Sequence, residues 1–165
     1  MKIEKISDIY EVLKGYTRKK RLVVAFANDS HSIEAVYMAV KAGLVEGILV
    51  GDTETIQGVC KENGYDESCF KIVHEPNDVR GAETAGEMIR NGEADVIMKG
   101  LVSTDKYMRA ILNKERGLVA PNAILSHVVV MECSSYHKLL TVSDVAVIPC
   151  PDLNQKISMI KYVTI

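Results

Sequence analysis

The sequence contains no tryptophan and only two phenylalanines, and aromatic residues make up 5% of its 165 positions. Surfaces that stack single-stranded nucleic acid need aromatic side chains, and a formal net charge of −2 supplies no basic surface for nucleic acid or anionic lipid. No apolar run approaches the roughly 20 residues that cross a bilayer. Residues 1–9 alternate charged and apolar side chains, unlike a signal peptide. We therefore expect a cytoplasmic protein without nucleic-acid or membrane partners.

The cysteines and glycines lack the spacing of several common sites. The four cysteines form no C-x-x-C pair, which disfavours zinc, and in a reducing compartment free thiols are expected. No activating neighbour is visible in sequence, so structural thiols are favoured over catalytic nucleophiles. The patterns of a P-loop and of Gly-x-Gly-x-x-Gly are both absent. The absence of these patterns consequently makes a nucleotide-binding oxidoreductase domain a weaker hypothesis than the two functions considered below.

Apolar runs alternate with amphipathic segments along the first two thirds of the chain. Strands are expected at 22–27, 47–50, 70–74 and 96–98, and helices at 3–13, 33–42, 53–63 and 79–91, with Thr53 as a helix cap. Continuous apolar runs such as 22–27 and 96–98 are typical of strands buried on both faces. Short βαβ spacing predicts a three-layer α/β fold, in which a mostly parallel sheet carries helices on both faces.

The regular alternation of apolar runs and amphipathic segments changes after Leu118. A long strand is expected at 123–131, shorter strands at 139–142 and 145–148, and a last helix at 153–162 capped by Asp152. No repeat, low-complexity segment or linker interrupts the chain, so residues 1–165 are predicted to form a single α/β unit.

Polar residues follow each of the expected parallel strands. Ligands of open parallel sheets bind beyond the carboxyl ends of the strands. Four segments would therefore line one rim, namely Asn28-Asp29, Gly51-Asp52, Glu75-Pro76-Asn77 and Lys99–Thr104.

The last of these segments carries the strongest signal for an anion. Lys99-Gly100 ends an apolar run, and Ser103-Thr104 precedes apolar residues at helical spacing. Glycine lets a backbone approach a ligand closely, and a helix start presents unpaired N–H groups and the positive end of the dipole. Lys99 and Arg109 bracket the turn with positive charge. The pattern predicts a phosphate-binding turn.

Six segments taken in order resemble the phosphate acetyl/butyryltransferase family, closest to its phosphate butyryltransferase branch. They are Leu49–Asp52, His74–Asn77, Ala94–Thr104, Leu112–Glu115, Leu125–Val128 and Ser143–Ala146. The resemblance implies an isocitrate dehydrogenase-like α/β fold and exchange of coenzyme A and inorganic phosphate on a short or branched acyl group. It implies substrates rather than bound cofactors, and no metal. Separately, the last helix carries Leu153, Ile157, Ile160 and Val163 at helical spacing, and we expect this apolar surface to cause self-association into a homodimer or higher oligomer.

Family members are about twice this long, so the chain resembles their N-terminal half. The family's catalytic serine, arginine and aspartate fall in the half without a counterpart, and no catalytic residue is assigned here. Substrate-binding roles carry over to Lys99, Gly100, Ser103, Thr104, Arg109, Ser126 and His127. Arg109 is similar to a family arginine that binds substrate. A binding or assembly module without turnover is the alternative function.

Each site residue also has a plain structural interpretation. Lys99 and Gly100 can simply end a strand and turn, Ser103 or Thr104 can cap a helix, and Arg109 can be solvated. Packing or turn formation alone can also explain five further residues, namely Ser126, His127, Asn28, Asp29 and Asp144.

Overall fold

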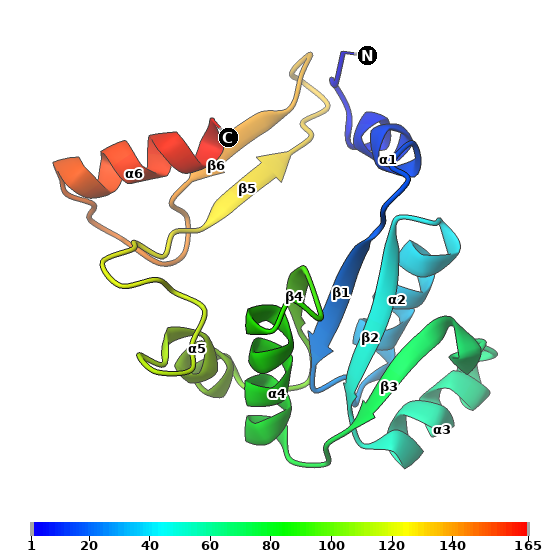
Figure 1. Cartoon of the computed structure of the whole chain (residues 1–165). Helices are drawn as coiled ribbons and strands as arrows, with labels where there is room; N and C mark the ends of the chain where they lie inside the picture. Colours follow the sequence, from blue (N-terminus) through cyan, green and yellow to red (C-terminus); the bar gives the residue numbers. More distant parts are fainter. Residues whose placement is uncertain (1, 165) are drawn as a thin grey trace. The chain divides into compact units, whose positions relative to one another are not determined.

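The computed structural model describes residues 2–164, and the chain divides into two compact units (Figure 1). The larger unit spans Tyr16–Val119. The smaller unit combines the residues up to Gly15 with those from Ala120 onward. The sequence pattern predicts one unit over 1–165, and the change in this pattern after Leu118 falls next to the division.

The larger unit is a three-layer α/β structure, as the alternation of strands and helices predicts. Its four-stranded sheet has the order β3-β2-β1-β4, and all neighbouring strands are parallel. The strands are β1 (Lys20–Ala25), β2 (Val45–Gly51), β3 (Phe70–His74) and β4 (Val96–Lys99). The helices are α2 (Ser30–Lys41), α3 (Thr53–Asn63), α4 (Asp78–Arg90) and α5 (Thr104–Leu112), with a 3₁₀ turn, η1 (Glu67–Cys69). Figure 1 shows α2 and α3 on one side of this sheet and α4 on the other.

Each face of the sheet has its own hydrophobic core. Val23 and Ala25 of β1 pack with residues of α4, whereas Val24 packs with residues of α2 and α3. All three β1 residues have no exposed surface. The expectation of a strand buried on both faces is therefore confirmed for β1.

The same expectation is wrong for β4. This strand pairs with β1 alone among the described strands and forms an edge of the sheet. Val96 is consequently 45% exposed, although Ile97 and Met98 are partly buried.

Side chains at the ends of β1, β2 and β3 cap the helices that follow. Asp29, Asp52 and Asn77 accept backbone hydrogen bonds at the starts of α2, α3 and α4. The expected cap Thr53 is wrong, because Asp52 bonds both the backbone and the hydroxyl of Thr55, at 2.9 and 2.6 Å. At the far end of α2, Gly43 has φ of 72° and takes the position expected after a helix.

The smaller unit contains an antiparallel pair of strands, and its helices confirm the two that the sequence predicts. Its elements are α1 (Ile6–Lys14), β5 (Val128–Met131), β6 (Leu140–Ser143) and α6 (Leu153–Val163), and β5 pairs with β6. No helix in the described part of the chain is long and apolar enough to cross a membrane.

Two strand predictions in this region are wrong. The strand expected at 123–131 begins only at Val128, and the strand expected at 145–148 is absent, since residues 145–147 form a bend. The carboxylate of Asp144 accepts hydrogen bonds from the backbone of Ala146 and Val147, at 2.7 and 2.8 Å. This local turn removes these N–H groups from any ladder, and apolar composition alone does not reveal it.

Candidate functional site

The loops at the carboxyl ends of β1, β2 and β3 are joined by hydrogen bonds. The backbone of Asp52 donates to Asn28 Oδ1 at 2.9 Å, and Glu75 N donates to Gly51 O at 2.8 Å. The backbone N–H of Thr53 and its hydroxyl both lie within hydrogen-bond distance of His74 Nδ1. The structure thus brings the predicted rim segments of these three strands together.

The fourth rim segment is attached to the end of β1. Gly100 N donates to Ala25 O at 3.0 Å, and Leu101 N donates to Phe26 O at 2.8 Å. A β-carbon on Gly100 would collide with Phe26 O. Gly100 is therefore needed for a close approach of two backbones, a structural requirement that coexists with a role toward a ligand.

Phe26 adopts an unusual backbone conformation at this point. Its φ is 65°, which is uncommon for a bulky residue and tends to occur at functional sites. Gly81 of α4 makes room for it, because a β-carbon there would lie 3.3 Å from the Phe26 ring. Neither periodicity nor composition marks Phe26, so the sequence interpretation did not single it out.

The remaining residues of the predicted phosphate-binding turn surround the start of α5. Lys99 is exposed, and its Nζ lies 3.5 Å from Gly100 O. Ser103 is the helix cap, accepting from Lys106 N at 3.3 Å, and Thr104 is the exposed first residue of the helix. The plain role of Ser103 is thus present, and the other early N–H groups of α5 remain available to an anion.

Two further cations lie on α5. The Arg109 side chain is 80% exposed and pairs with Asp105 at 3.1 Å, one turn earlier. Lys106 Nζ contacts Asp78 Oδ2 of α4 at 2.6 Å, and this hydrogen bond is the main cause of a lowered pKa at Asp78. Lys106, which the sequence interpretation did not single out, therefore connects the starts of α4 and α5.

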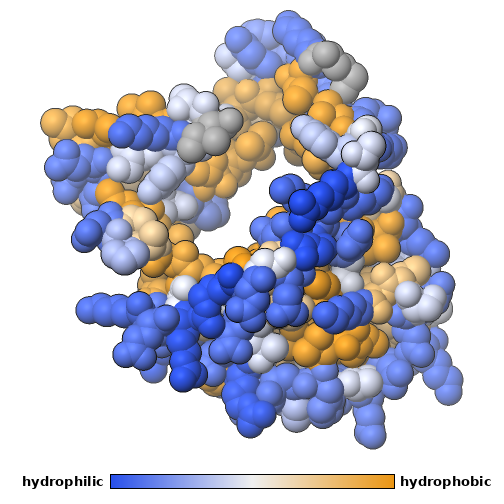
Figure 2. Space-filling model, in the orientation of Figure 1, coloured by the Kyte–Doolittle hydropathy of each residue, from blue (hydrophilic) through white to orange (hydrophobic). Residues whose placement is uncertain are grey.

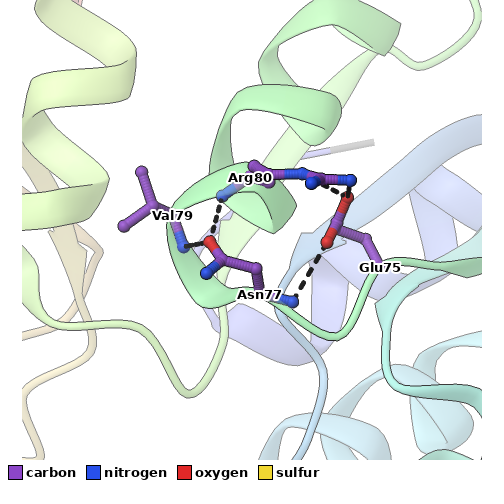
Figure 3. A network of polar contacts seen from close by, with 4 residues as sticks. All are labelled: Glu75, Asn77, Val79 and Arg80. Carbon is purple, nitrogen blue, oxygen red and sulfur yellow. Dashed lines mark hydrogen bonds and ion pairs between the residues drawn. The ribbon is translucent and has the colours of Figure 1, made fainter.

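A nearly buried carboxylate lies where β3 leads into α4 (Figure 3). Glu75 is 8% exposed; its Oε2 accepts from Arg80 Nε at 3.0 Å, and its Oε1 accepts from Asn77 N at 3.0 Å. Asn77 Oδ1 in turn accepts from Val79 N and Arg80 N. The negative charge of Glu75 is thereby balanced by Arg80, which limits its repulsion of an anion at the rim.

Ser126 and His127 belong to the smaller unit, whereas the other predicted site residues belong to the larger one. The structure places them just before β5 and not inside a strand. Ser126 Oγ and His127 N both donate to Asp144 Oδ2 at 3.0 Å. Among the described side chains, His127 Nδ1 is buried without a hydrogen-bond partner.

Asp144 is the centre of this group. Partial burial raises its pKa, but hydrogen bonds from the backbones of Val147, Ala146 and His127 and from the Ser126 hydroxyl outweigh burial and hold the pKa far below the ordinary range. The carboxylate is therefore ionised and fully engaged in connecting two loops. The arrangement explains Asp144 as a turn residue and leaves the Ser126 hydroxyl committed to it.

The cysteines are free thiols, as expected: Cys60 is buried, Cys69 is half-buried, and Cys133 and Cys150 are exposed. The structure adds a neighbour that sequence spacing did not mark as activating. Hydrogen bonds from the side chain and backbone of Ser135 lower the pKa of the Cys133 thiol. Within residues 2–164, no three histidine, cysteine or acidic side chains gather in a metal-binding arrangement.

Comparisons with known proteins agree on one family. Residues 79–162 match the family described as phosphate acetyl/butaryl transferase. The chain is 39% identical over 158 residues to phosphate butyryltransferase of Clostridium acetobutylicum, covering 96% of this chain and 52% of that protein. It is 32% identical over 157 residues to phosphate acetyltransferase of Thermotoga maritima, covering 95% and 52%.

Solved structures share the fold. A branched-chain phosphotransacylase from Enterococcus faecalis has a TM-score of 0.69 at 22% identity, covering 86% of this chain and 49% of that one. A phosphotransacetylase from Staphylococcus aureus has a TM-score of 0.72 at 14% identity, covering 92% and 54%. At these identities the likeness concerns the fold alone. The chain spans about half the length of the curated relatives that it matches.

Proposed function

The chain belongs to the phosphate acetyl/butyryltransferase family, and from this premise we propose that it takes part in the exchange of coenzyme A and inorganic phosphate on an acyl group. The reaction converts acyl-CoA and phosphate to an acyl phosphate and coenzyme A in the cytoplasm. The acyl group is butyryl or another short or branched chain, because the relative at 39% identity is named phosphate butyryltransferase.

The observation that carries the proposal is the turn from Lys99 to Thr104. Two backbone hydrogen bonds attach it to the end of β1, and it leads directly into α5, which begins at Thr104. Phosphate and the phosphates of coenzyme A are anions that fixed N–H donors and cations bind well. Lys99 and Arg109 supply the charge, and Gly100 permits the close backbone approach that shapes the turn.

In the proposed chemistry, a phosphate oxygen attacks the thioester carbonyl carbon and the C–S bond breaks. Coenzyme A leaves as the thiolate and takes up a proton. Negative charge develops on the carbonyl oxygen, and positioning with oxyanion stabilisation accelerates the step. No metal or tightly held cofactor enters the proposal. The residues of the larger unit that we propose for binding are Lys99, Gly100, Ser103, Thr104 and Arg109.

A second candidate is a module that binds phosphate or coenzyme A without turnover. The observation that favours it is the coverage, because about half of each curated relative has no counterpart in this chain. The family resemblance puts the catalytic serine, arginine and aspartate in that other half. Binding by this chain and turnover by this chain are consequently separate questions.

Calorimetric titration with phosphate and with coenzyme A tests the binding site. Replacing Lys99 by alanine removes a charge-assisted contact and should weaken binding about 10- to 100-fold. Lys61→Ala, which removes an exposed lysine from α3, is the matched control and should leave the affinity unchanged. Equal affinity in wild type and Lys99→Ala would reject the site.

A thiol-release assay with butyryl-CoA and phosphate separates the two functions. Losing one oxyanion donor typically costs about 10²–10³ in rate, so we expect weak or undetectable turnover from this chain alone. Binding without turnover favours the module, and turnover on the order of 10 per second favours a complete acyltransferase.

A further inference from the structure

Lys106 is a cation at the start of α5 to which the proposed function gives no role. It is the third residue of the helix, and helical side chains extend toward the N-terminus of their helix. Its side chain is therefore directed toward the first turn, beside the phosphate-binding turn. Ser103 accepts hydrogen bonds from Lys106 N and, through its carbonyl oxygen, from Tyr107 N. The N–H groups of Thr104 and Asp105 consequently remain as donors for a ligand.

Asp78 holds the Lys106 ammonium group at this place. The distance from Lys106 Nζ to Asp78 Oδ2 is 2.6 Å, and Asp78 is the first residue of α4. This hydrogen bond lowers the pKa of Asp78, so the carboxylate stays ionised near neutral pH. The side chains are 44% and 27% exposed, so the pair is only partly solvated. Lys106 Nζ therefore lies where the starts of α4 and α5 meet.

Lys106 is able to bind an anion without losing its contact with Asp78. An ammonium group has three N–H donors, and the hydrogen bond to Asp78 uses one of them. Figure 2 shows hydrophilic side chains at the surface over α4 and α5, where a dissolved anion has access. The Arg109 side chain, at 80% exposure, is more solvated than Lys106. Immobilising a flexible side chain costs affinity, so Lys106 is better prepared to hold a ligand than Arg109 is.

The charges at the two helix starts nearly cancel, and Lys106 decides their sum. They comprise three cations and two carboxylates, namely Lys99, Lys106, Arg109, Asp78 and Asp105. Arg109 is paired with Asp105, as Lys106 is with Asp78. Without Lys106, two cations would face two carboxylates, and the turn would have no net positive charge to attract an anion. Lys106 thus supplies the excess charge that a phosphate needs there.

We propose that Lys106 binds a phosphate group at the start of α5, together with the N–H groups of Thr104 and Asp105. The group belongs to inorganic phosphate or to coenzyme A, since both present the same oxyanion. This inference rests on the proposed function, because it adds a residue to the same site. The competing explanation is that Lys106 only attaches α5 to α4 through Asp78.

Calorimetric titration of the full chain with inorganic phosphate and with coenzyme A tests the role of Lys106. Lys106→Met keeps the length of the side chain but removes its charge, and it should weaken binding about tenfold or more. Lys106→Gln, a second uncharged variant, should behave alike, whereas Lys106→Arg should restore most of the affinity. Lys114→Met, the matched control, removes an exposed lysine beyond the end of α5 and should bind as the wild type does. A loss for one ligand alone assigns Lys106 to that ligand.

Asp78→Asn separates ligand binding from the attachment of α5. The amide oxygen of asparagine still accepts a hydrogen bond from Lys106, but a negative charge close to the anion is removed. Binding should therefore be as tight as in the wild type or tighter. If the ion pair only attached α5 to α4, Asp78→Asn and Lys106→Met would both weaken binding, because either change removes the pair.

Two results would overturn the inference while leaving the proposed function intact. One is unchanged affinity for both ligands in Lys106→Met when Lys99→Ala binds weakly, and the other is weaker binding in Asp78→Asn. If Lys99→Ala also binds as the wild type does, the site itself is rejected, and the role of Lys106 with it. Thermal unfolding of Lys106→Met should stay close to that of the wild type, because a partly exposed ion pair contributes little stability.

Discussion

The carbonyl oxygen of Phe26 fills the space in which a side chain on Gly100 would begin. Phe26, at φ of 65°, also accepts the hydrogen bond of Leu101 N at 2.8 Å. The candidate anion-binding turn is therefore positioned by contact with the end of β1. Any group added to Gly100 must displace backbone, which cannot move aside as a flexible side chain can.

Replacing Gly100 by alanine should lower the free energy of unfolding by about 1–3 kcal/mol, the usual range for overpacking a fitted site. It should also weaken phosphate binding, because the start of α5 would shift. Urea denaturation and calorimetric titration measure the two effects. The matched control is Gly58→Ala in α3, where an added β-carbon would have no atom within 4 Å beyond its chain neighbours and the backbone of its own helix. That change should raise stability by up to about 1 kcal/mol, and equal effects at both glycines would contradict the close approach.

Two arginines near the rim should respond differently to truncation. Arg80→Ala leaves the nearly buried Glu75 carboxylate without its cation and should lower stability by about 1–2 kcal/mol. Arg109→Ala removes an exposed pair with Asp105 and should change stability little, while weakening phosphate binding. Thermal unfolding and titration of both variants check this contrast. A larger stability loss at Arg109 than at Arg80 would contradict the stabilising role of Arg80 beside the nearly buried Glu75 carboxylate.

The Arg21–Asp95 pair should make the free energy of unfolding depend on pH in the acidic range. The Arg21 side chain and backbone both donate to Asp95, and these bonds hold the pKa of Asp95 far below its ordinary value. A carboxyl with a lowered folded-state pKa stabilises the protein above its unfolded pKa of about 3.9. That contribution decreases as the pH falls below this value toward the folded-state pKa.

Asp95→Asn should therefore be less stable than wild type at pH 7, and the difference should shrink as the pH falls from 5 to 2. Urea denaturation across this range measures it. Parallel stability curves for the two proteins would rule out the assigned shift.

The chain alone should self-associate, because Leu153, Ile157 and Ile160 form an exposed apolar stripe on α6. Sedimentation equilibrium should show an apparent mass that rises with concentration, and Ile160→Lys should reduce this rise more than Asn154→Lys does. A monomer at every accessible concentration would exclude the expected oligomer.

Much of the larger unit follows from local patterns. The strand expected at 70–74 has the same bounds as β3. Such apolar runs, with the one at 22–27, alternate with amphipathic helices, and this alternation predicts a parallel sheet with helices on both faces. Capping residues mark helix starts within one or two positions, as at Ser103 and Asp152. The rim follows from the same alternation, because parallel strands end at the same edge.

Sequence by itself also determined the family, through ordered motifs such as 94–104 and 125–128. Only the tertiary structure decided which strand is an edge, where β5 begins, and why position 100 is glycine. It also divided the chain into two units, and among the described residues of the smaller one it buries a single hydrophobic side chain, Met159. The physical reason is the separation of the interacting residues along the chain. Periodicity and capping act over a few neighbouring residues. The edge position of a strand, the approach of Gly100 to Phe26 and the Asp144 turn beside Ser126 depend instead on residues that folding brings together.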